Sequence, residues 1–426
     1  MSCGAAEVAT PPQTPPDEST APHDLTADVG RWRRIHASQL DPDRDAERLD
    51  QIRQLEAIGY VSGSVPAGLA SGVETRIEDK MAEGLTLITS GHAPEAFLID
   101  ARGAVLHRWS RTYAEIWPER AAADPDEQTT FWRRTRLLPN GHLLAIFDGR
   151  GIIELDAHSN LVWARWNGAH HDLDVGDDGK IYVLTRQAQL LPDVNPDRPI
   201  LEDFIEVLDA DGARLRRISL LEAFESSDFA GAARPAYARA GDLFHTNTVS
   251  LLDGQIVEEA PAFAAGNLML SSFALHWLAV LDPERETIVW VQRGGFRNQH
   301  DPQILQNGNM LLFDNRGENV GDHHASAVLE LDPVTGHERW AYRGTEASPF
   351  YSSTCGAAQR LPNGNTLISE SDRGRAFEVT PDGEIVWQYR NPHRAGEAND
   401  LIATLFEAWR LPPDFPLGWL EAPGHR

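Results

Sequence analysis

Cysteine is almost absent from this chain of 426 residues, which contains only Cys3 and Cys355. Two cysteines cannot form a disulfide framework or a cysteine-based zinc site, and a thiol nucleophile would have to be Cys355. The sequence also lacks any apolar run of about 18 residues, so no segment is predicted to span a membrane as a helix. The motifs GxxxxGK(S/T), HExxH and GxSxG are missing as well, which argues against the chemistries that they carry.

Basic residues are scarce relative to acidic ones. The chain has 38 Lys and Arg against 64 Asp and Glu, a net charge of −26 with histidine neutral. Such a surface repels phosphate backbones and anionic lipids, so we predict neither nucleic acid nor a charged membrane surface as a partner. An anionic small substrate would need positive groups gathered where it binds.

The N-terminal region has too little apolar content to form a core, and residues 1–38 are predicted to be a disordered tether. Cys3 stands between a small residue and a glycine, ahead of a stretch rich in proline and threonine. This arrangement is typical of a bacterial lipoprotein that has lost its signal peptide. It predicts a periplasmic or cell-envelope protein tethered to the membrane through a lipidated Cys3; an ordinary disordered terminus is the alternative.

Short helices are predicted at both ends of the folded region. The first lies in a lead-in segment that we assign to residues 39–83, because apolar residues recur there at helical spacing before Gly59: Leu49, Ile52, Leu55 and Ile58. The second begins near Asn399, with prolines after it and three apolar residues along one side: Leu401, Leu405 and Trp409.

From about residue 84 the sequence repeats. One unit is an apolar strand, a turn and a second strand, with six copies: "AFLIDARGAVLHRW", "IIELDAHSNLVWARW", "IEVLDADGARLRRI", "LAVLDPERETIVWVQ", "AVLELDPVTGHERWAY" and "AFEVTPDGEIVWQY". A second hairpin unit alternates with it, with a glycine in its turn and five copies: "TRLLPNGHLLAIFD", "HDLDVGDDGKIYVLT", "HTNTVSLLDGQIV", "HDPQILQNGNMLLFDN" and "AAQRLPNGNTLISES". Two hairpins make a four-stranded blade. We therefore predict that residues 84–426 form an all-β, six-bladed β-propeller with short helical segments at its ends, in preference to a β-sandwich.

In a propeller, the innermost strand of each blade starts at one mouth of the central channel, and the second strand returns to that mouth. His171 and His300 each precede a turn glycine by eight residues, and His245 precedes one by nine. The shared offset predicts that these three histidines converge at the mouth. His170 is adjacent to His171 and points elsewhere if strand neighbours alternate faces.

Arginines follow the second strands at a similarly constant offset, seven to nine residues past the turn glycines: Arg150, Arg186, Arg316 and Arg373. Each alone would be expected to pair with a surface carboxylate. Together at one mouth they predict an anion-binding ring, because guanidinium groups bind oxyanions in a bidentate manner. His323 and His324 fall in a loop that could reach the same mouth, but we interpret them first as solvated loop residues. The histidines away from the shared offset are interpreted as structural or exposed: His107, His142, His276, His337 and His393.

Four blocks, "QHDPQILQNGNMLLFDNRG", "HHDLDVGDDGKIYVLTR", "LFHTNTVSLLD" and "AQRLPNGNTLISES", together resemble the bacterial arylsulfate sulfotransferase (arylsulfotransferase) family. The resemblance implies a six-bladed periplasmic propeller that moves a sulfuryl group from an aryl sulfate to a phenol without a nucleotide sulfate donor. One histidine of the mouth carries the group transiently, and no metal or organic cofactor is needed. His300 and Arg316 match the functional positions of the family best, and His245 and His171 match less closely.

One position departs from the family pattern. Members of known activity place the sulfuryl-carrying histidine at about the point where this chain has Cys355, nine residues before Gly364. The predicted catalytic residues are thus His300, Arg316, His245 and His171. The predicted substrate-binding residues are Arg150, Arg186, Arg373, His170 and Cys355.

Two other functions remain open from the sequence. Three histidines from separate blades, with Cys355, could ligate iron, copper or zinc, although nearby arginines disfavour a cation. A propeller can also be a binding platform without catalytic activity.

Overall fold

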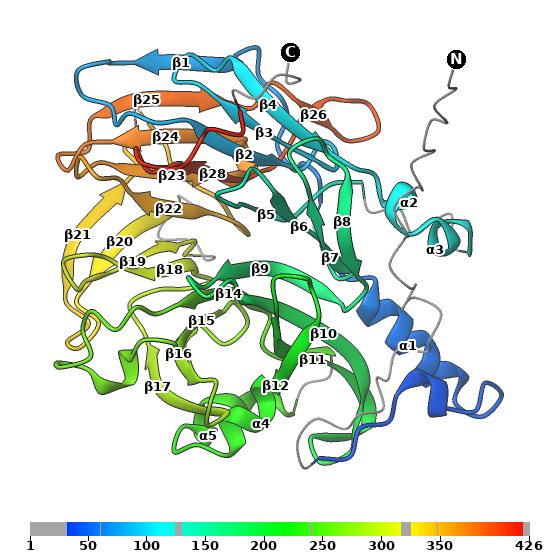
Figure 1. Ribbon diagram of the computed structural model, residues 1–426. Coiled ribbons are helices and arrows are strands. Elements are labelled where there is room, and N and C mark those ends of the chain that lie inside the picture. The colour runs from blue at the N-terminus through cyan, green and yellow to red at the C-terminus, as the bar shows by residue number, and fades with distance from the viewer. Residues whose placement is uncertain are drawn as a thin grey trace, which may run out of the picture.

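Six antiparallel sheets are arranged around a central axis, so the predicted six-bladed β-propeller is confirmed (Figure 1). The computed structural model describes residues 32–59, 61–123, 130–238, 241–316, 325–346 and 348–420. From the axis outward, blade 1 consists of β28 (Leu405–Arg410), β2 (Thr86–Ser90), β3 (Glu95–Ile99) and β4 (Val105–Ser110). Blade 2 consists of β5 (Arg134–Leu137), β6 (Leu143–Phe147), β7 (Gly151–Leu155) and β8 (Leu161–Arg165). Blade 3 consists of β9 (Ala169–Val175), β10 (Ile181–Leu191), β11 (Asn195–Leu208) and β12 (Arg214–Ser219).

Blades 4 to 6 follow in chain order. Blade 4 consists of β14 (Thr246–Leu251), β15 (Leu268–Ser272), β16 (Trp277–Asp282) and β17 (Thr287–Arg293). Blade 5 consists of β18 (His300–Ile304), β19 (Met310–Asp314), β20 (Ala327–Leu331) and β21 (Glu338–Arg343). Blade 6 consists of β22 (Ala357–Arg360), β23 (Thr366–Glu370), β24 (Arg375–Val379), β25 (Ile385–Arg390) and, outermost, β1 (Gly72–Arg76). The short strands are β13 (Gly241–Asp242), which pairs with β11, and β26 (Arg394–Ala395) with β27 (Leu401–Ile402).

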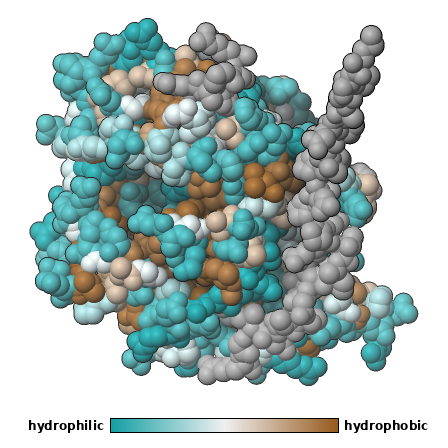
Figure 2. Space-filling model, viewed as in Figure 1, coloured by the Kyte–Doolittle hydropathy of each residue, from teal (hydrophilic) through white to brown (hydrophobic). Residues whose placement is uncertain are grey.

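Helices are few and short. They are α1 (Ala46–Glu56), α2 (Tyr113–Ile116), α3 (Pro118–Ala123), α4 (Leu220–Glu225) and α5 (Ala230–Ala233), with 3-10 turns η1 (Ala37–Gln39), η2 (Arg234–Ala236), η3 (Pro261–Phe263) and η4 (Ser371–Arg373). Within the described ranges no helix has the length and apolar character needed to cross a bilayer. The face seen in Figure 2 is mostly hydrophilic, with smaller hydrophobic areas, as the strongly acidic composition leads one to expect.

The hydrophobic core is divided among the interfaces between blades. Six buried clusters each join two adjacent blades, so that the core runs around the whole ring. The middle strands are covered on both faces, and all five residues of β6 are therefore buried and apolar. The outermost strands face solvent on one side: β8 is exposed or half-buried along its length. This is why the inner units of the sequence contain continuous apolar runs whereas the outer units mix polar and apolar residues.

The C-terminal segment that we predicted as a helix is instead β27 and β28. β28 pairs with β2 and becomes the innermost strand of blade 1, so strands from both ends of the chain form that blade. The spacing of Leu401, Leu405 and Trp409 fits a helix locally. The unpaired edge of β2, more than 300 residues away in the chain, decides the outcome, because it offers hydrogen bonds and a buried face that a helix could not use.

Three further expectations need correction. In the unit around His245, β14 is followed by residues 252–267 with η3, and the second strand is β15, not "QIV". The lead-in segment contains β1 as well as the predicted helix α1. Residues 32–38, which we assigned to the tether, pack on blade 3: Arg34 is buried and forms ion pairs of 2.8 Å and 3.0 Å with Glu202 and Glu222. Its partners lie in a distant part of the chain, where local composition cannot reveal them. Cys3 lies outside the described residues.

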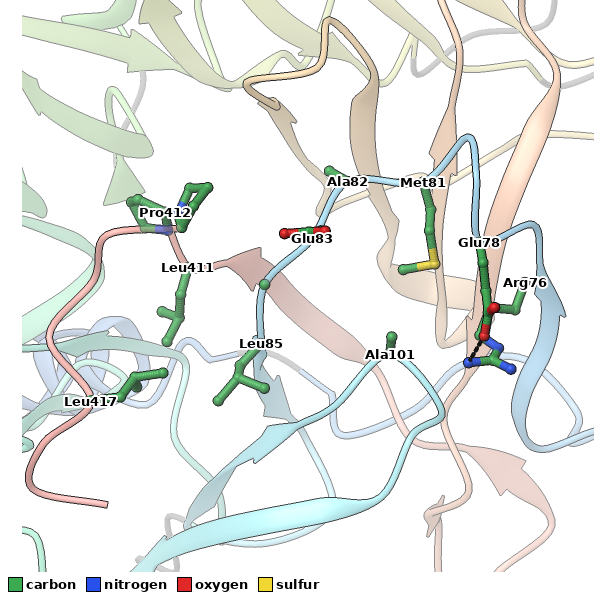
Figure 3. Close-up of a pocket in the computed structure, with 12 residues that line it drawn as sticks. Arg76, Glu78, Met81, Ala82, Glu83, Leu85, Ala101, Leu411, Pro412 and Leu417 are labelled. Atoms are coloured by element: carbon green, nitrogen blue, oxygen red, sulfur yellow. Dashed lines mark ion pairs between the residues drawn. The ribbon is translucent and has the colours of Figure 1, made fainter. Parts of the chain in front are cut away.

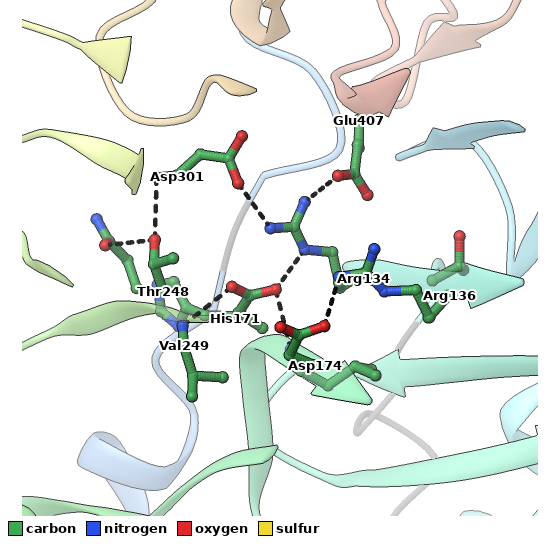
Figure 4. Close-up of polar contacts among 12 residues, drawn as sticks. Arg134, Arg136, His171, Asp174, Thr248, Val249, Asp301 and Glu407 are labelled. Carbon is green, nitrogen blue, oxygen red and sulfur yellow. Dashed lines mark hydrogen bonds and ion pairs between the residues drawn. The ribbon is translucent and has the colours of Figure 1, made fainter. Parts of the chain in front are cut away.

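A network of charged side chains lines the central channel. The guanidinium of Arg134 contacts Asp172 at 2.6 Å, Asp301 at 3.3 Å and Glu407 at 2.6 Å, and so joins blades 2, 3, 5 and 1 (Figure 4). These residues line a cavity of 230 Å³ in the channel, together with Arg136, which lies 3.2 Å from Asp174. Burial raises the pKa of Asp301 to about 6, although Arg134 opposes the shift.

Removal of this central cation should destabilise the propeller strongly. We expect Arg134→Leu to lower the free energy of unfolding by about 3–5 kcal/mol, because one buried and two half-buried carboxylates lose their common partner. The loss should be smaller at about pH 5 than at about pH 8. Asp301 has a raised folded-state pKa, so it binds a proton as the pH falls and the repulsion among the carboxylates decreases. Denaturant unfolding at both pH values measures this.

Arg136→Leu, which removes a half-buried pair with one carboxylate, is the control and should lose about 1 kcal/mol or less. Equal losses for the two variants, or a loss independent of pH, would contradict the proposed role of Arg134.

Candidate active site

Three histidines that share one offset in the sequence lie together at one mouth of the channel. His171 lies in β9, His245 directly precedes β14 and His300 begins β18, so each stands at or near the start of an innermost strand. The Nε2 atoms of His171 and His245 are 3.2 Å apart. The ring of Phe273 is centred 5.1 Å from that of His245 and 6.0 Å from that of His300. The structure therefore places these histidines around one site, as the offset predicted.

His170, His171 and His245 form a hydrogen-bonded string that is bonded to the carboxylate of Asp242 at one end and lies near that of Asp203 at the other. Asp242 Oδ2 lies 2.6 Å from His245 Nδ1, and His171 Nδ1 lies 2.7 Å from His170 Nδ1. At the far end, His170 Nε2 lies 3.7 Å from Asp203 Oδ1. The string runs from blade 4 into the buried interior of blade 3, and His170 is thus part of it although it is adjacent to His171.

The string carries a proton preferentially at His245. Burial lowers the pKa of His245, but the hydrogen bond and the negative charge of Asp242 outweigh burial, and the pKa is raised. Burial, reinforced by neighbouring positive charges, lowers the pKa of His170 and of His171 well below the usual range. Burial also raises the pKa of Asp203 to about 7. Near neutral pH the string therefore holds an imidazolium at His245 next to two neutral imidazoles.

His300 is a neutral imidazole with a defined tautomer. Its Nδ1 lies 2.9 Å from the carbonyl oxygen of Asn298 and 2.8 Å from Oδ1 of Asn315. The amide nitrogen of Asn315 donates to the carbonyl oxygens of Ser352 and Cys355, so its oxygen must face His300. Since both neighbours of Nδ1 are acceptors, Nδ1 carries the hydrogen and Nε2 carries the lone pair.

The Nε2 atom of His300 is buried and has no hydrogen-bond partner among the described residues. Burial, and then the positive charge of Arg133, lower the pKa of His300 to about 3. A buried nitrogen with a lone pair and no partner is costly unless a ligand uses it. The lone pair on Nε2 of His300 is therefore available to a ligand or an electrophile.

The cation beside His300 is Arg133, which sequence reasoning missed. Arg133 directly precedes β5 and lies eight residues before Gly141, so it occupies in blade 2 the position that the histidines occupy in blades 3, 4 and 5. It is 5% exposed, and its guanidinium carbon lies 4.8 Å from the centre of the Phe406 ring. The offset that identifies the histidines also identifies Arg133, because Arg133 stands at the same distance from its turn glycine.

Each of the four predicted arginines has an oxygen partner within the protein. Arg186 lies beside the histidines: it is buried, its Nη2 lies 3.8 Å from Asp148, it donates to the carbonyl of Ile58, and its charge lowers the pKa of His170. The other three pair elsewhere: Arg150 with the carbonyl oxygen of Glu56 (3.0 Å), Arg316 with Asp314 (3.0 Å) and Arg373 with Glu370 (3.5 Å). Carboxylates close in the chain engage Arg316 and Arg373, which is the ordinary outcome in an acidic protein.

Cys355 lies at the mouth but is enclosed. It is 1% exposed and packs in a small buried cluster with Phe131 and Phe406, and burial raises the pKa of its thiol. A buried, protonated thiol is a poor nucleophile. His323 and His324 lie outside the described residues.

The metal-site alternative receives no support at the mouth. Among the described residues, the grouping with metal-ligand spacing consists of His92, Glu95 and His393, not of the mouth histidines. In that grouping Glu95 already binds Arg108 at 2.8 Å, and the rings of His92 and His393 stack face to face with centres 3.5 Å apart. A larger cavity of 410 Å³, lined largely by apolar residues, lies at the other end of β28, beside Leu85 and Leu411, and contains no histidine (Figure 3).

Comparison with known proteins gives one family. A model of the arylsulfotransferase family matches residues 134–392, from the first strand of blade 2 to just past β25 in blade 6. A search of curated proteins finds no match. Solved structures similar to this chain include a protein of unknown function from Bacteroides caccae (12% identity, TM-score 0.46, covering 76% of this chain and 98% of that one). Another is a streptogramin B lyase (13% identity, TM-score 0.42, covering 78% of this chain and 85% of that one). A third is the WD40 propeller domain of Doa1 (12% identity, TM-score 0.41, covering 79% of this chain and 88% of that one).

The protonation states of the two central histidines can be measured directly. We expect nitrogen-15 NMR of the histidine rings to show His300 protonated on Nδ1 alone and without titration from about pH 5 to about pH 9, because burial and Arg133 keep its pKa low. The ring of His245 should titrate above the usual histidine range. Asn315→Leu, which removes an acceptor, should disturb the signals of His300 and leave those of His337 unchanged. A His300 that becomes doubly protonated near neutral pH would contradict the assignment.

Proposed function

This chain belongs to the arylsulfotransferase family, as the motifs around His300 predicted, and on that premise we propose that it moves a sulfuryl group from a phenol sulfate ester to a phenol. The observation that carries the proposal is the state of His300, a buried neutral imidazole whose Nε2 lone pair has no partner in the described residues. Attack on sulfur requires such a lone pair, and a positive group beside it that stabilises the transferred oxygens.

In the first half of the proposed reaction, Nε2 of His300 donates its lone pair to the sulfur of the aryl sulfate. The bond between sulfur and the phenolic oxygen breaks, and the phenolate leaves with that electron pair. The ring of His300, now bonded to sulfur, becomes positively charged while Nδ1 keeps its hydrogen. The oxygens of Asn298 and Asn315 accept that hydrogen and so stabilise the charge.

The departing phenolate needs a proton, and His245 can supply it. Asp242 keeps His245 protonated, and Nε2 of His245 lies 3.2 Å from Nε2 of His171. In the second half, the acceptor phenol attacks sulfur, the bond from sulfur to Nε2 of His300 breaks, and the phenolic proton returns to His245. The two halves together are a ping-pong transfer in which protons and electron pairs balance without a nucleotide donor.

Arg133 is the group we assign to the sulfuryl oxygens. The negative charge of the group in transfer spreads over three oxygens, and a buried guanidinium that does not have to reorganise stabilises it effectively. The positive charge of Arg133 lowers the pKa of both His300 and His171, which supports this assignment. We assign Arg186 and Asp148 to holding the string in place, because the backbone N–H of His171 donates to Asp148 at 3.1 Å.

The cysteine at the family's nucleophile position fits this assignment. The thiol of Cys355 is buried, and its carbonyl oxygen accepts from Asn315, which in turn orients His300. We propose that the nucleophile in this chain is His300, one blade away from its position in the family, and that Cys355 serves to support it.

Release of nitrophenol from p-nitrophenyl sulfate, with and without added phenol, tests the reaction. We expect phenol-dependent release by the wild type, loss of transfer in His300→Gln, and a decrease of kcat by about 10²–10³ in Arg133→Gln, the effect of losing one donor to the transition state. Rapid quenching at alkaline pH without acceptor should trap one SO₃ group on His300, identified by mass spectrometry. His337→Ala, an exposed histidine, is the control. A well-folded wild type that binds aryl sulfate but transfers nothing would favour the non-catalytic binding platform.

The pH dependence of turnover tests the role of His245. Because the protonated form is the acid, kcat/KM with a poor leaving group should fall as the pH rises through the raised pKa of His245. Asp242→Asn removes the charge that raises this pKa, so the alkaline limb should move down by about 1–3 pH units. An unchanged alkaline limb in this variant would assign the proton to another group.

A further inference from the structure

The turn between β15 and β16 places an aromatic side chain between the two central histidines. Phe273 is half-buried, and its ring lies 5.1 Å from that of His245 and 6.0 Å from that of His300, measured between centres. Its neighbours in the chain pack in the core: Trp277 and Leu275 both contact the cluster between blades 3 and 4. Phe273 belongs to none of the hydrophobic clusters of the described residues. The core thus does not account for this ring.

The turn is held firmly to both histidine segments. The backbone N–H of Phe273 donates to the carbonyl oxygen of His245 at 3.1 Å, and Leu275 N–H donates to Ser272 Oγ at 3.2 Å. On the other side, His276 Nδ1 accepts from the backbone of Asn298 at 3.2 Å, and the carbonyl of Asn298 is the one that orients His300. The position of the Phe273 ring is therefore fixed relative to both histidines, as a binding surface requires.

The surrounding charges define what could lie on this ring. Arg133 and the imidazolium of His245 provide positive charge at the mouth of a strongly acidic protein. Two other aromatic rings at the mouth, those of Phe131 and Phe406, belong to residues that are 8% and 2% exposed, and they pack against each other with centres 5.3 Å apart. Phe273 keeps more of its ring exposed than they do, beside a nucleophile and a cation. A molecule that joins an aromatic ring to an anionic group matches this combination.

We propose that Phe273 is the aryl-binding surface of the site and selects aromatic over aliphatic donors and acceptors. This inference rests on the proposed sulfuryl transfer and deepens it. The phenyl ring of the donor, and later of the acceptor, packs on Phe273 in an offset or edge-to-face arrangement, with its phenolic oxygen toward His245 and the sulfur toward His300.

Binding measurements on the full chain test this independently of catalysis. Calorimetric titration with phenol, which cannot react without a donor, should show about 3- to 10-fold weaker binding in Phe273→Leu, the effect of losing one aromatic pair. Phe273→Tyr, which retains the ring, should bind within about 2-fold of the wild type. Leu275→Val, in the same turn but directed to the core, is the matched control and should bind like the wild type. Thermal unfolding of each variant establishes that it is folded.

Kinetics separate the two proposals. If sulfuryl transfer occurs, Phe273→Leu should raise KM for phenols more than it lowers kcat, and should reduce the preference for phenols over aliphatic alcohols of similar size. If the wild type binds phenols through Phe273 but transfers no sulfuryl group, the aryl-binding surface stands and the proposed function fails. If transfer occurs and Phe273→Leu binds phenols as the wild type does, or Leu275→Val loses as much affinity, the inference about Phe273 is wrong.

Discussion

The innermost strand of each blade has one edge that faces the channel and no neighbouring strand to pair with it, and the structure depends on how these edges are satisfied. Side-chain carboxylates of one blade accept the backbone N–H groups of the next. Asp172 accepts from Val249 at 3.0 Å, Asp203 from Thr246 at 2.9 Å, and Asp301 from Ala358 at 3.0 Å. Unsatisfied buried N–H groups would destabilise the fold, so these contacts also fix the register between blades. Arg134 compensates the charge that the carboxylates bring to the axis.

The geometry of the candidate site follows from this register. Because neighbouring inner strands are held at the same height, residues at equivalent positions meet at the mouth: Arg133, His171, His245, His300 and Cys355. The strand that closes the ring contributes as well, since Phe406 of β28 packs against Arg133 and lies in the cluster with Cys355. The arrangement of the site therefore depends on ring closure between the two ends of the chain, and the fold and the site form together.

Burial has opposite consequences for histidines a few ångströms apart. His300 has hydrogen-bond acceptors at Nδ1, and burial together with the charge of Arg133 lowers its pKa, so it stays neutral and keeps a lone pair on Nε2. His245 has Asp242 at 2.6 Å, and there the carboxylate prevails over burial and keeps the proton on the ring. A single mouth thus holds one unprotonated nitrogen with a free lone pair and one ring that can give a proton. Group transfer with a poor leaving group requires this difference in pKa between neighbouring groups.

The sequence by itself determined the six-bladed architecture and the positions of His171, His245 and His300, because hairpin signals and strand offsets are local and repeat with each blade. It also indicated the family, through the residues around His300. Only the tertiary structure decided the C-terminal strand, since β28 exists because the edge of β2 accepts it. It also decided which arginines serve the site: Arg150, Arg316 and Arg373 have partners elsewhere, whereas Arg133 stands beside His300. The charge state of each histidine was equally beyond the sequence, because burial and the nearest partner, not residue type, determine its pKa.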